Sequence, residues 1–182
     1  MTARSNRLLV LGLGNPLCSD DGLGVAAVEE LSRRYQPPAG ALVLDGGTLG
    51  LSLLPLLEDA EDAILVDAVR DDARPGTLVR LEGAEVRPAV EARLSVHQVG
   101  VADLVAAADL RGRLPRRLAL VGLVPATIEL GLGLSPAVAP RLPALVEAVA
   151  AEACRMGHRF LERPSHAPVL AGGTLGPRAL GL

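Results

Sequence analysis

Two adjacent acids, Asp20 and Asp21, stand at the boundary between an apolar run and an amphipathic segment. Residues 8–11 predict a buried strand, and apolar residues at helical spacing over 25–35 predict a helix. An aspartate before a helix can simply cap it by accepting hydrogen bonds from free backbone N–H groups. One cap needs a single acid, so the pair predicts a functional loop.

Further polar residues are predicted near these acids. Asp45 and Asp67 each end an apolar run that predicts a strand. The carboxyl ends of parallel strands meet at the sheet edge where open α/β sheets bind ligands. The segment Ser95-Val96-His97-Gln98 has the form of a capping box, which predicts His97 in the first turn of a helix.

Asp21, Asp67 and His97 together would form a site of two carboxylates and an imidazole. Such a donor set suits a borderline divalent metal such as nickel or zinc and leaves room for an outside ligand. The same residues could instead cap a helix, end a strand and make an ordinary surface hydrogen bond, and spacing does not choose between these interpretations. A Cys18 nucleophile with His97 as base is disfavoured, because nearby acids raise the pKa of a thiol.

The glycines of the same loop do not match the common phosphate-binding motifs. A dinucleotide fingerprint needs a third glycine where this chain has Leu17, and a P-loop needs a lysine, which the chain lacks entirely. Carboxylates also stand where a phosphate would require positive charge. We therefore expect no nucleotide and no other organic cofactor.

Composition limits the remaining classes of function. The chain has 182 residues, a formal net charge of −3 and 1% aromatic residues, which disfavours nucleic-acid binding. Its longest apolar region, residues 118–134, contains Pro125 and Glu129 and is too interrupted to span a bilayer. We expect a cytoplasmic protein with one domain over residues 1–157 and a flexible tail over 158–182.

The order of the predicted elements indicates an α/β fold: three α/β/α layers around a mostly parallel, twisted sheet of about five strands. Strands are predicted at residues 8–11, 41–44, 63–66, 77–80 and 118–122. The link between the third and fourth is short for a parallel crossover, so one strand should be antiparallel. A last helix is predicted from Ser135-Pro136 to near Gly157, with first turns disturbed by Pro140 and Pro143.

Five landmarks in order resemble the maturation endopeptidases of nickel-iron hydrogenases. They lie within residues 8–155 and read Gly12-Leu-Gly-Asn-Pro through Asp20-Asp21-Gly-Leu-Gly, Asp45-Gly-Gly-Thr-Leu-Gly-Leu, Ile64-Leu-Val-Asp67-Ala-Val, Ser95-x-His97-Gln98-x-Gly100, and Leu120-Val-Gly122-x-x-Pro125-x-x-Ile128-Glu129 followed by Leu134-Ser135-Pro136. The resemblance implies an aspartyl-type endopeptidase that removes a C-terminal extension from the hydrogenase large-subunit precursor after nickel insertion.

The resemblance also implies roles for individual residues. Asp21, Asp67 and His97 match the family's metal-binding residues, although the first acid is Glu in the best-known members. The nickel would arrive with the substrate, and the three side chains would recognise it and position the cleavage site. Asp45 and its neighbouring glycines would shape the cleft.

Two alternatives remain beside this interpretation. Peptidyl-tRNA hydrolases share the opening Gly-Leu-Gly-Asn-Pro, but the likeness stops at Pro16, and an acidic chain offers a poor surface for tRNA. A catalytically silent module that binds a metalloprotein precursor would retain the same fold. The tail repeats Gly46-Gly-Thr-Leu-Gly50 at residues 172–176, for which chance in a Gly- and Leu-rich chain is a sufficient explanation.

Overall fold

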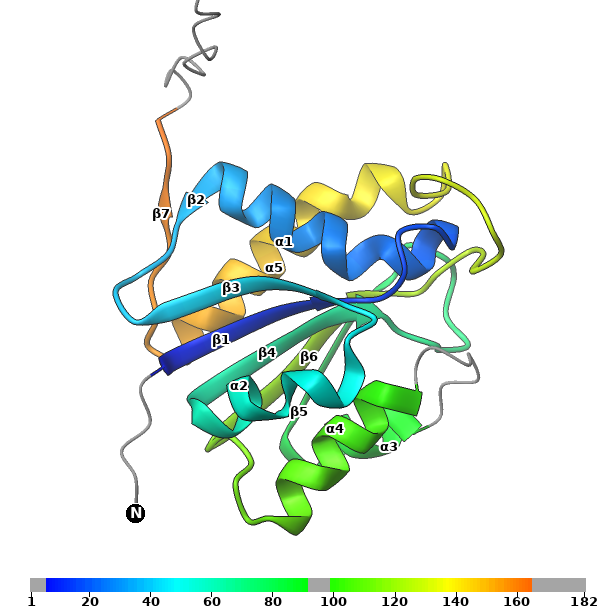
Figure 1. Cartoon of the computed structure of the whole chain (residues 1–182). Coiled ribbons are helices and arrows are strands. Elements are labelled where there is room, and N and C mark those ends of the chain that lie inside the picture. Colours follow the sequence, from blue (N-terminus) through cyan, green and yellow to red (C-terminus); the bar gives the residue numbers. More distant parts are fainter. Residues whose placement is uncertain (1–5, 92–98, 165–182) are drawn as a thin grey trace, which may run out of the picture.

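A computed structural model describes residues 6–91 and 99–164. In this part of the chain, five strands form a sheet with the order β3-β1-β4-β6-β5 (Figure 1). Their bounds are β1 Asn6–Leu13, β3 Ala41–Gly47, β4 Ala60–Ala68, β5 Leu78–Glu82 and β6 Arg117–Leu123. All neighbouring pairs are parallel except β5 and β6, which are antiparallel. The predicted mostly parallel sheet is confirmed.

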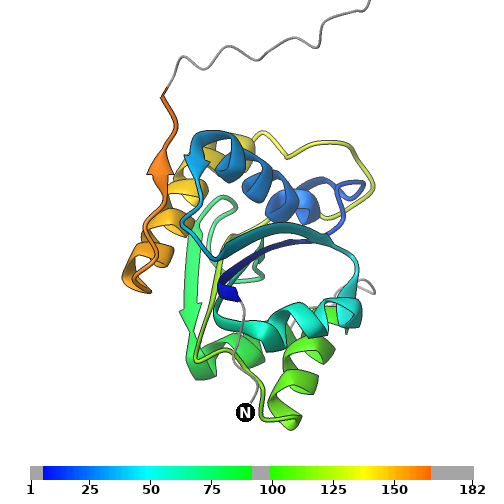
Figure 2. The ribbon, with the colours of Figure 1, turned by 60° about the vertical axis from the view of Figure 1, so that its left-hand side comes forward.

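Helices cover both faces of the sheet, as Figures 1 and 2 show from two directions. Helices α1 (Leu23–Arg34) and α5 (Leu142–Arg155) lie on one face. The other face carries α2 (Leu54–Asp59), α3 (Val86–Glu91) and α4 (Val99–Leu110). Short 3₁₀ turns stand at η1 (Ser19–Gly22), η2 (Gly50–Leu53), η3 (Gly83–Glu85) and η4 (Ala139–Arg141). Among the described residues, no helix has the length and apolar character needed to cross a membrane.

Strand β1 shows how the sequence produces two cores. Leu8 and Val10 are buried against the layer of α1 and α5, whereas Leu9 and Leu11 are buried against the layer of α2 to α4. This alternation follows from the two-residue period of a strand. Because both sets are apolar, β1 must be covered on both faces, which confirms the predicted α/β/α layers.

Strand β5 is the antiparallel edge strand that the short link predicts. A turn closes the link where the Thr77 N–H donates to the Arg74 carbonyl at 3.0 Å. Gly76 takes a φ of +82°, a left-handed conformation that suits glycine in a tight turn. The chain can therefore reverse within a few residues, where a parallel crossover would need a dozen or more.

The last helix begins later than the sequence predicts. Helix α5 starts at Leu142 rather than after Pro136, because Pro140 lies in the preceding turn η4 and Pro143 occupies the first turn of α5. A proline is tolerated only in the first turn, where its missing N–H leaves no intrahelical bond unmade. Helix α4 is confirmed, and its stripe Val101, Leu104, Val105 and Ala108 is buried.

The predicted tail cannot begin at His158, because the chain packs on the body as far as residue 162. The His158 imidazole contacts Asp62 with 2.8 Å between Nε2 and Oδ2. Phe160 is buried edge-on against Tyr35. Strand β7 (Leu161–Glu162) then pairs with β2 (Tyr35–Gln36). The rest of the predicted tail, with its Gly-Gly-Thr-Leu-Gly repeat, lies outside the described residues.

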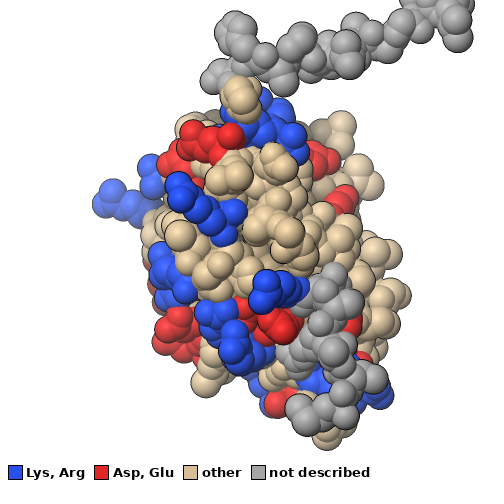
Figure 3. All heavy atoms as spheres, turned by 90° about the vertical axis from the view of Figure 1, so that its left-hand side faces the viewer, with Lys and Arg blue, Asp and Glu red and all other residues tan. Residues whose placement is uncertain are grey.

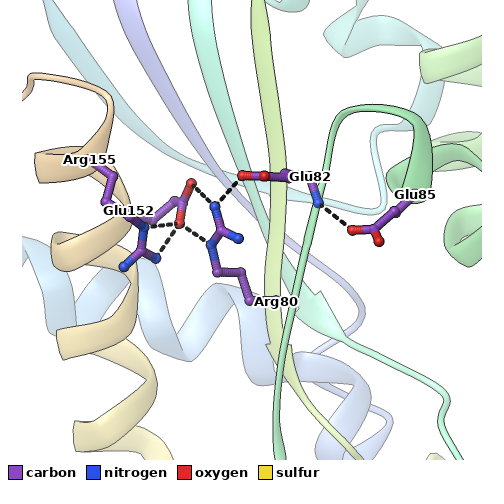
Figure 4. Close-up of polar contacts among 5 residues, drawn as sticks. All are labelled: Arg80, Glu82, Glu85, Glu152 and Arg155. Carbon is purple, nitrogen blue, oxygen red and sulfur yellow. Dashed lines mark hydrogen bonds and ion pairs between the residues drawn. The ribbon is translucent and has the colours of Figure 1, made fainter.

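Ion pairs fasten α5 to the edge strand β5. Arginine and acidic side chains lie side by side on the face in Figure 3. In the cluster of Figure 4, the nearly buried Glu152 carboxylate accepts from Arg80 at 2.5 Å and from the Arg155 Nε at 2.9 Å. Burial acts to raise the pKa of Glu152, but the hydrogen bonds from both guanidiniums outweigh it and hold the pKa below its ordinary value.

The buried Asp62 carboxylate forms a second cluster at the start of β4. It accepts from Arg117, with 2.8 Å between Nε and Oδ1, and it contacts His158. Burial again acts to raise the pKa of Asp62, whereas the hydrogen bonds from Arg117 and His158 lower it further than burial raises it. The carboxyl pKa therefore lies below its ordinary value here as well.

These two clusters predict acid destabilisation. The folded pKa of each carboxyl is below the unfolded pKa, so the unfolded chain binds more protons in acid. Their stabilisation is complete above the ordinary carboxyl pKa of about 4 and is lost as the pH falls through the folded pKa. Urea unfolding should show Glu152→Gln less stable than wild type at neutral pH, with a difference in the free energy of unfolding that narrows as the pH falls below about 4. A difference independent of pH would contradict this account.

Candidate functional site

The loop after β1 is positioned by close packing between α1 and the sheet. A Cβ added at Gly24 in α1 would lie 2.1 Å from the Val66 carbonyl oxygen and 2.4 Å from that of Leu13. Only glycine permits this approach, so the start of α1 is pressed against β1 and β4. Gly12 and Gly24 thus permit close packing between the helix and the sheet.

The strand order places this loop at a topological switch point. The chain passes from β1 to β3 on one side and then returns past β1 to β4 on the other. A crevice at such a point, at the carboxyl ends of the strands, is where open α/β sheets bind ligands. Asp21 follows β1 and Asp67 lies one residue before the end of β4, so both acids belong to this edge.

Asp21 and Asp67 flank the same turn at Gly14. A Cβ added at Gly14 would lie 1.7 Å from the Asp21 carbonyl oxygen and 3.7 Å from the Asp67 Oδ1. Both acids are nearly inaccessible, with 3% and 1% of their surfaces exposed. The Asn15 N–H donates to the Asp21 carboxylate at 2.8 Å, and the Ala68 N–H donates to that of Asp67 at 2.7 Å. The structure therefore brings these two predicted site residues together and orients each carboxylate.

The neighbouring acid, Asp20, has a structural role that the sequence does not reveal. Its fully buried carboxylate accepts hydrogen bonds from the N–H groups of Ala126 and Thr127 and from both the N–H and the hydroxyl of Ser135, at 2.7–3.2 Å. These donors belong to the loop between β6 and η4. Asp20 thus fastens that loop to η1, whereas Asp21 remains the candidate site residue.

Neither Asp20 nor Asp21 caps helix α1. Among the described residues, no side chain caps α1 at Gly22. Ser19 takes a φ of +50°, which is strained for a residue with a side chain. Its N–H donates to Gly131 at 2.8 Å and its hydroxyl to the Glu129 carbonyl at 3.0 Å. These bonds hold the strained turn that directs the two acids inward.

Of the remaining candidates, the structure describes Asp45 and Cys18. Asp45 pairs with Gly12 across β3 and β1, and its exposed side chain lines a hollow of about 240 Å³ together with Pro16 and Glu29. Cys18 is half-buried in the acid-bearing loop. His97 lies outside the described residues, as does the predicted capping box. Within residues 6–91 and 99–164, no three metal-ligating side chains converge.

Fold and site together define an α/β protein with paired, buried carboxylates at the switch point of its sheet. Comparison with known proteins identifies the family. A family model described as HycI, hydrogenase maturation protease, matches residues 25–152. The hydrogenase expression/formation protein HupD of Rhodobacter capsulatus is 44% identical over 149 residues, which are 80% of this chain and 71% of that protein.

Solved structures agree with the sequence comparisons. The hydrogenase maturating endopeptidase HybD from Escherichia coli superposes with a TM-score of 0.82 at 37% identity, covering 86% of this chain and 98% of that one. The NiFe hydrogenase maturation protease HybD from Thermococcus kodakarensis has a TM-score of 0.64 at 31% identity, with coverage of 81% and 99%. The chain belongs to the hydrogenase maturation protease family and is an endopeptidase, a hydrolase.

Proposed function

We propose that this endopeptidase removes a C-terminal extension from the large-subunit precursor of a nickel-iron hydrogenase after nickel has been inserted. The observation that carries the proposal is the pair of buried carboxylates, Asp21 and Asp67, on either side of the Gly14 turn. The family membership supports hydrogenase as the client, and the similarity to the NiFe hydrogenase maturation protease of Thermococcus kodakarensis supports the nickel-iron type.

The nickel belongs to the substrate in this proposal. Two carboxylates and the imidazole of His97 would recognise the ion, since oxygen and nitrogen donors suit a borderline divalent metal. The backbone N–H groups of Asn15 and Ala68 orient the carboxylates before the substrate arrives, which supports their use as positioned ligands. Recognition of nickel would let the enzyme distinguish a loaded precursor from an empty one.

Hydrolysis breaks the peptide C–N bond, adds the oxygen of water to the carbonyl carbon and returns a proton to the amine. A carboxylate can take the proton from the attacking water, and a positioned general base contributes about 10²- to 10⁴-fold. Asp21 and Asp67 are therefore candidates for both metal recognition and water activation. Correct positioning of the cleavage segment by the enzyme surface would supply a further part of the rate.

Mass spectrometry of the intact precursor tests this proposal. The cognate large-subunit precursor is incubated with the protein in nickel-loaded and nickel-depleted forms. We expect loss of the C-terminal extension only from the loaded form. Equal cleavage of both forms would remove nickel recognition from the proposal. A loaded precursor that binds the protein and keeps its extension would instead indicate the catalytically silent binding module.

A further inference from the structure

The loop between β6 and η4 presents apolar side chains to solvent. Ile128, Leu130 and Leu132 are 44%, 87% and 85% exposed. Leu17, which is 58% exposed, lies beside them in the acid-bearing loop, where its carbonyl accepts from the Gly131 N–H at 3.0 Å. We call these four residues the apolar rim. Single exposed leucines are common on protein surfaces, but a group of them marks an interaction site more often.

The backbone that carries the apolar rim is held in place. Asp20 accepts from N–H groups at both ends of the stretch, at Ala126 and at Ser135. Between them, the Ser19 hydroxyl and N–H donate to the carbonyls of Glu129 and Gly131. The leucines are therefore displayed by a fixed loop, and a partner would find this surface preorganised.

The apolar rim adjoins the site of the paired carboxylates. Leu17 lies between Asn15, which donates to Asp21, and Asp20, which fastens the rim loop. In Figure 1, the acid-bearing loop and the loop after β6 meet at the same end of the sheet. Any large protein that inserts a segment at Asp21 and Asp67 must pass beside this surface.

The site itself offers too little surface to recognise a folded protein. The hollow between the acid-bearing loop and the loop after β6, lined by Ser19 and Gly133, holds about 240 Å³. Specific protein interfaces bury about 1,200–2,000 Å² in total. The additional contact area must come from the surroundings of the site, and the apolar rim lies on two loops that are hydrogen-bonded to each other at this edge.

We propose that the apolar rim docks an apolar surface on the body of the precursor whose extension is cleaved. This inference rests on the proposed function, because it assigns the rim to the same substrate. Docking beside the site would hold the cleavage segment at the carboxylates and would favour a folded client over free peptides. The rim then contributes to binding and leaves the chemical step unchanged.

The double variant Leu130→Ser/Leu132→Ser tests the docking. Leu110→Ser is the matched control, because Leu110 is 91% exposed at the end of α4, near the amino end of the sheet. In processing of the nickel-loaded precursor, we expect the double variant to raise KM at least about tenfold with kcat nearly unchanged, as for loss of interface anchors. The control should match wild type, and the melting temperatures of all three proteins should agree.

Each contrary outcome has a separate meaning. Unchanged KM in the double variant, with wild type active, overturns the docking and leaves the proposed function intact. If wild type leaves the loaded precursor uncut, the proposed function fails, and the docking is decided by the Kd of the precursor for wild type and double variant in biolayer interferometry. Equal Kd values overturn it. Self-association of wild type that the double variant abolishes would assign the rim to a second copy and would also overturn it.

Discussion

Replacing Asp67 by asparagine should lower kcat/KM for precursor processing by about 10²- to 10⁴-fold, the range for loss of a positioned carboxylate. The protein remains folded, because asparagine has nearly the same shape and its amide oxygen can still accept from the Ala68 N–H. The substitution removes the negative charge at the switch point beside Gly14. Both proposed roles, metal recognition and water activation, would need that charge, so either role predicts the same direction of change.

The measurement is a time course of precursor cleavage followed by intact mass, with stability checked by thermal unfolding. Asp21→Asn should show a loss of similar size, because Asp21 flanks the same turn. Asp103→Asn, a change at an exposed position of α4, serves as the control and should process at the wild-type rate. A folded Asp67→Asn variant with normal kinetics would remove Asp67 from the site. His97→Ala, in the same assay, tests the third predicted member.

The mostly parallel sheet and its one antiparallel strand could be predicted, because their causes are local. In the sequence, residues 8–11 form one apolar run, which indicates a buried strand. In the structure, their side chains alternate between the two cores. The short link that ends at Gly76 is equally local, and it forces β5 to run antiparallel. Such features depend on neighbouring residues alone, so no knowledge of tertiary contacts is needed.

The structural role of Asp20 could not be predicted, because it depends on distant partners. Both acids have the same chemistry and adjacent places in the chain. Asp20 receives its hydrogen bonds from residues 106 to 115 positions away, whereas Asp21 accepts from Asn15 in its own loop. Dependence on a distant partner also explains why the sequence predicts the tail to begin too early, since His158 contacts Asp62, 96 positions earlier in the chain.

Asp20→Ala should lower the free energy of unfolding by about 3 kcal/mol or more, because hydrogen bonds to a charged group contribute about 1.5–3 kcal/mol each and their buried partners are left unpaired. The N–H groups of Ala126, Thr127 and Ser135 would lose their shared acceptor, and alanine offers no replacement. Urea unfolding measures the loss. Hydrogen exchange locates it, with faster exchange expected at these three amides.

The effect expected for Asp20→Ala differs from that expected for the candidate site acid Asp67, which makes this prediction specific. Asp67→Asn should impair cleavage in a stable protein, whereas Asp20→Ala should first destabilise the chain and loosen the apolar rim. At a temperature where the Asp20→Ala variant is still folded, its KM for the precursor should rise while much of kcat is retained. A stable Asp20→Ala protein with unchanged exchange at residues 126–135 would show that other contacts suffice to hold the loop. A variant that loses kcat alone would place Asp20 in the catalytic site instead.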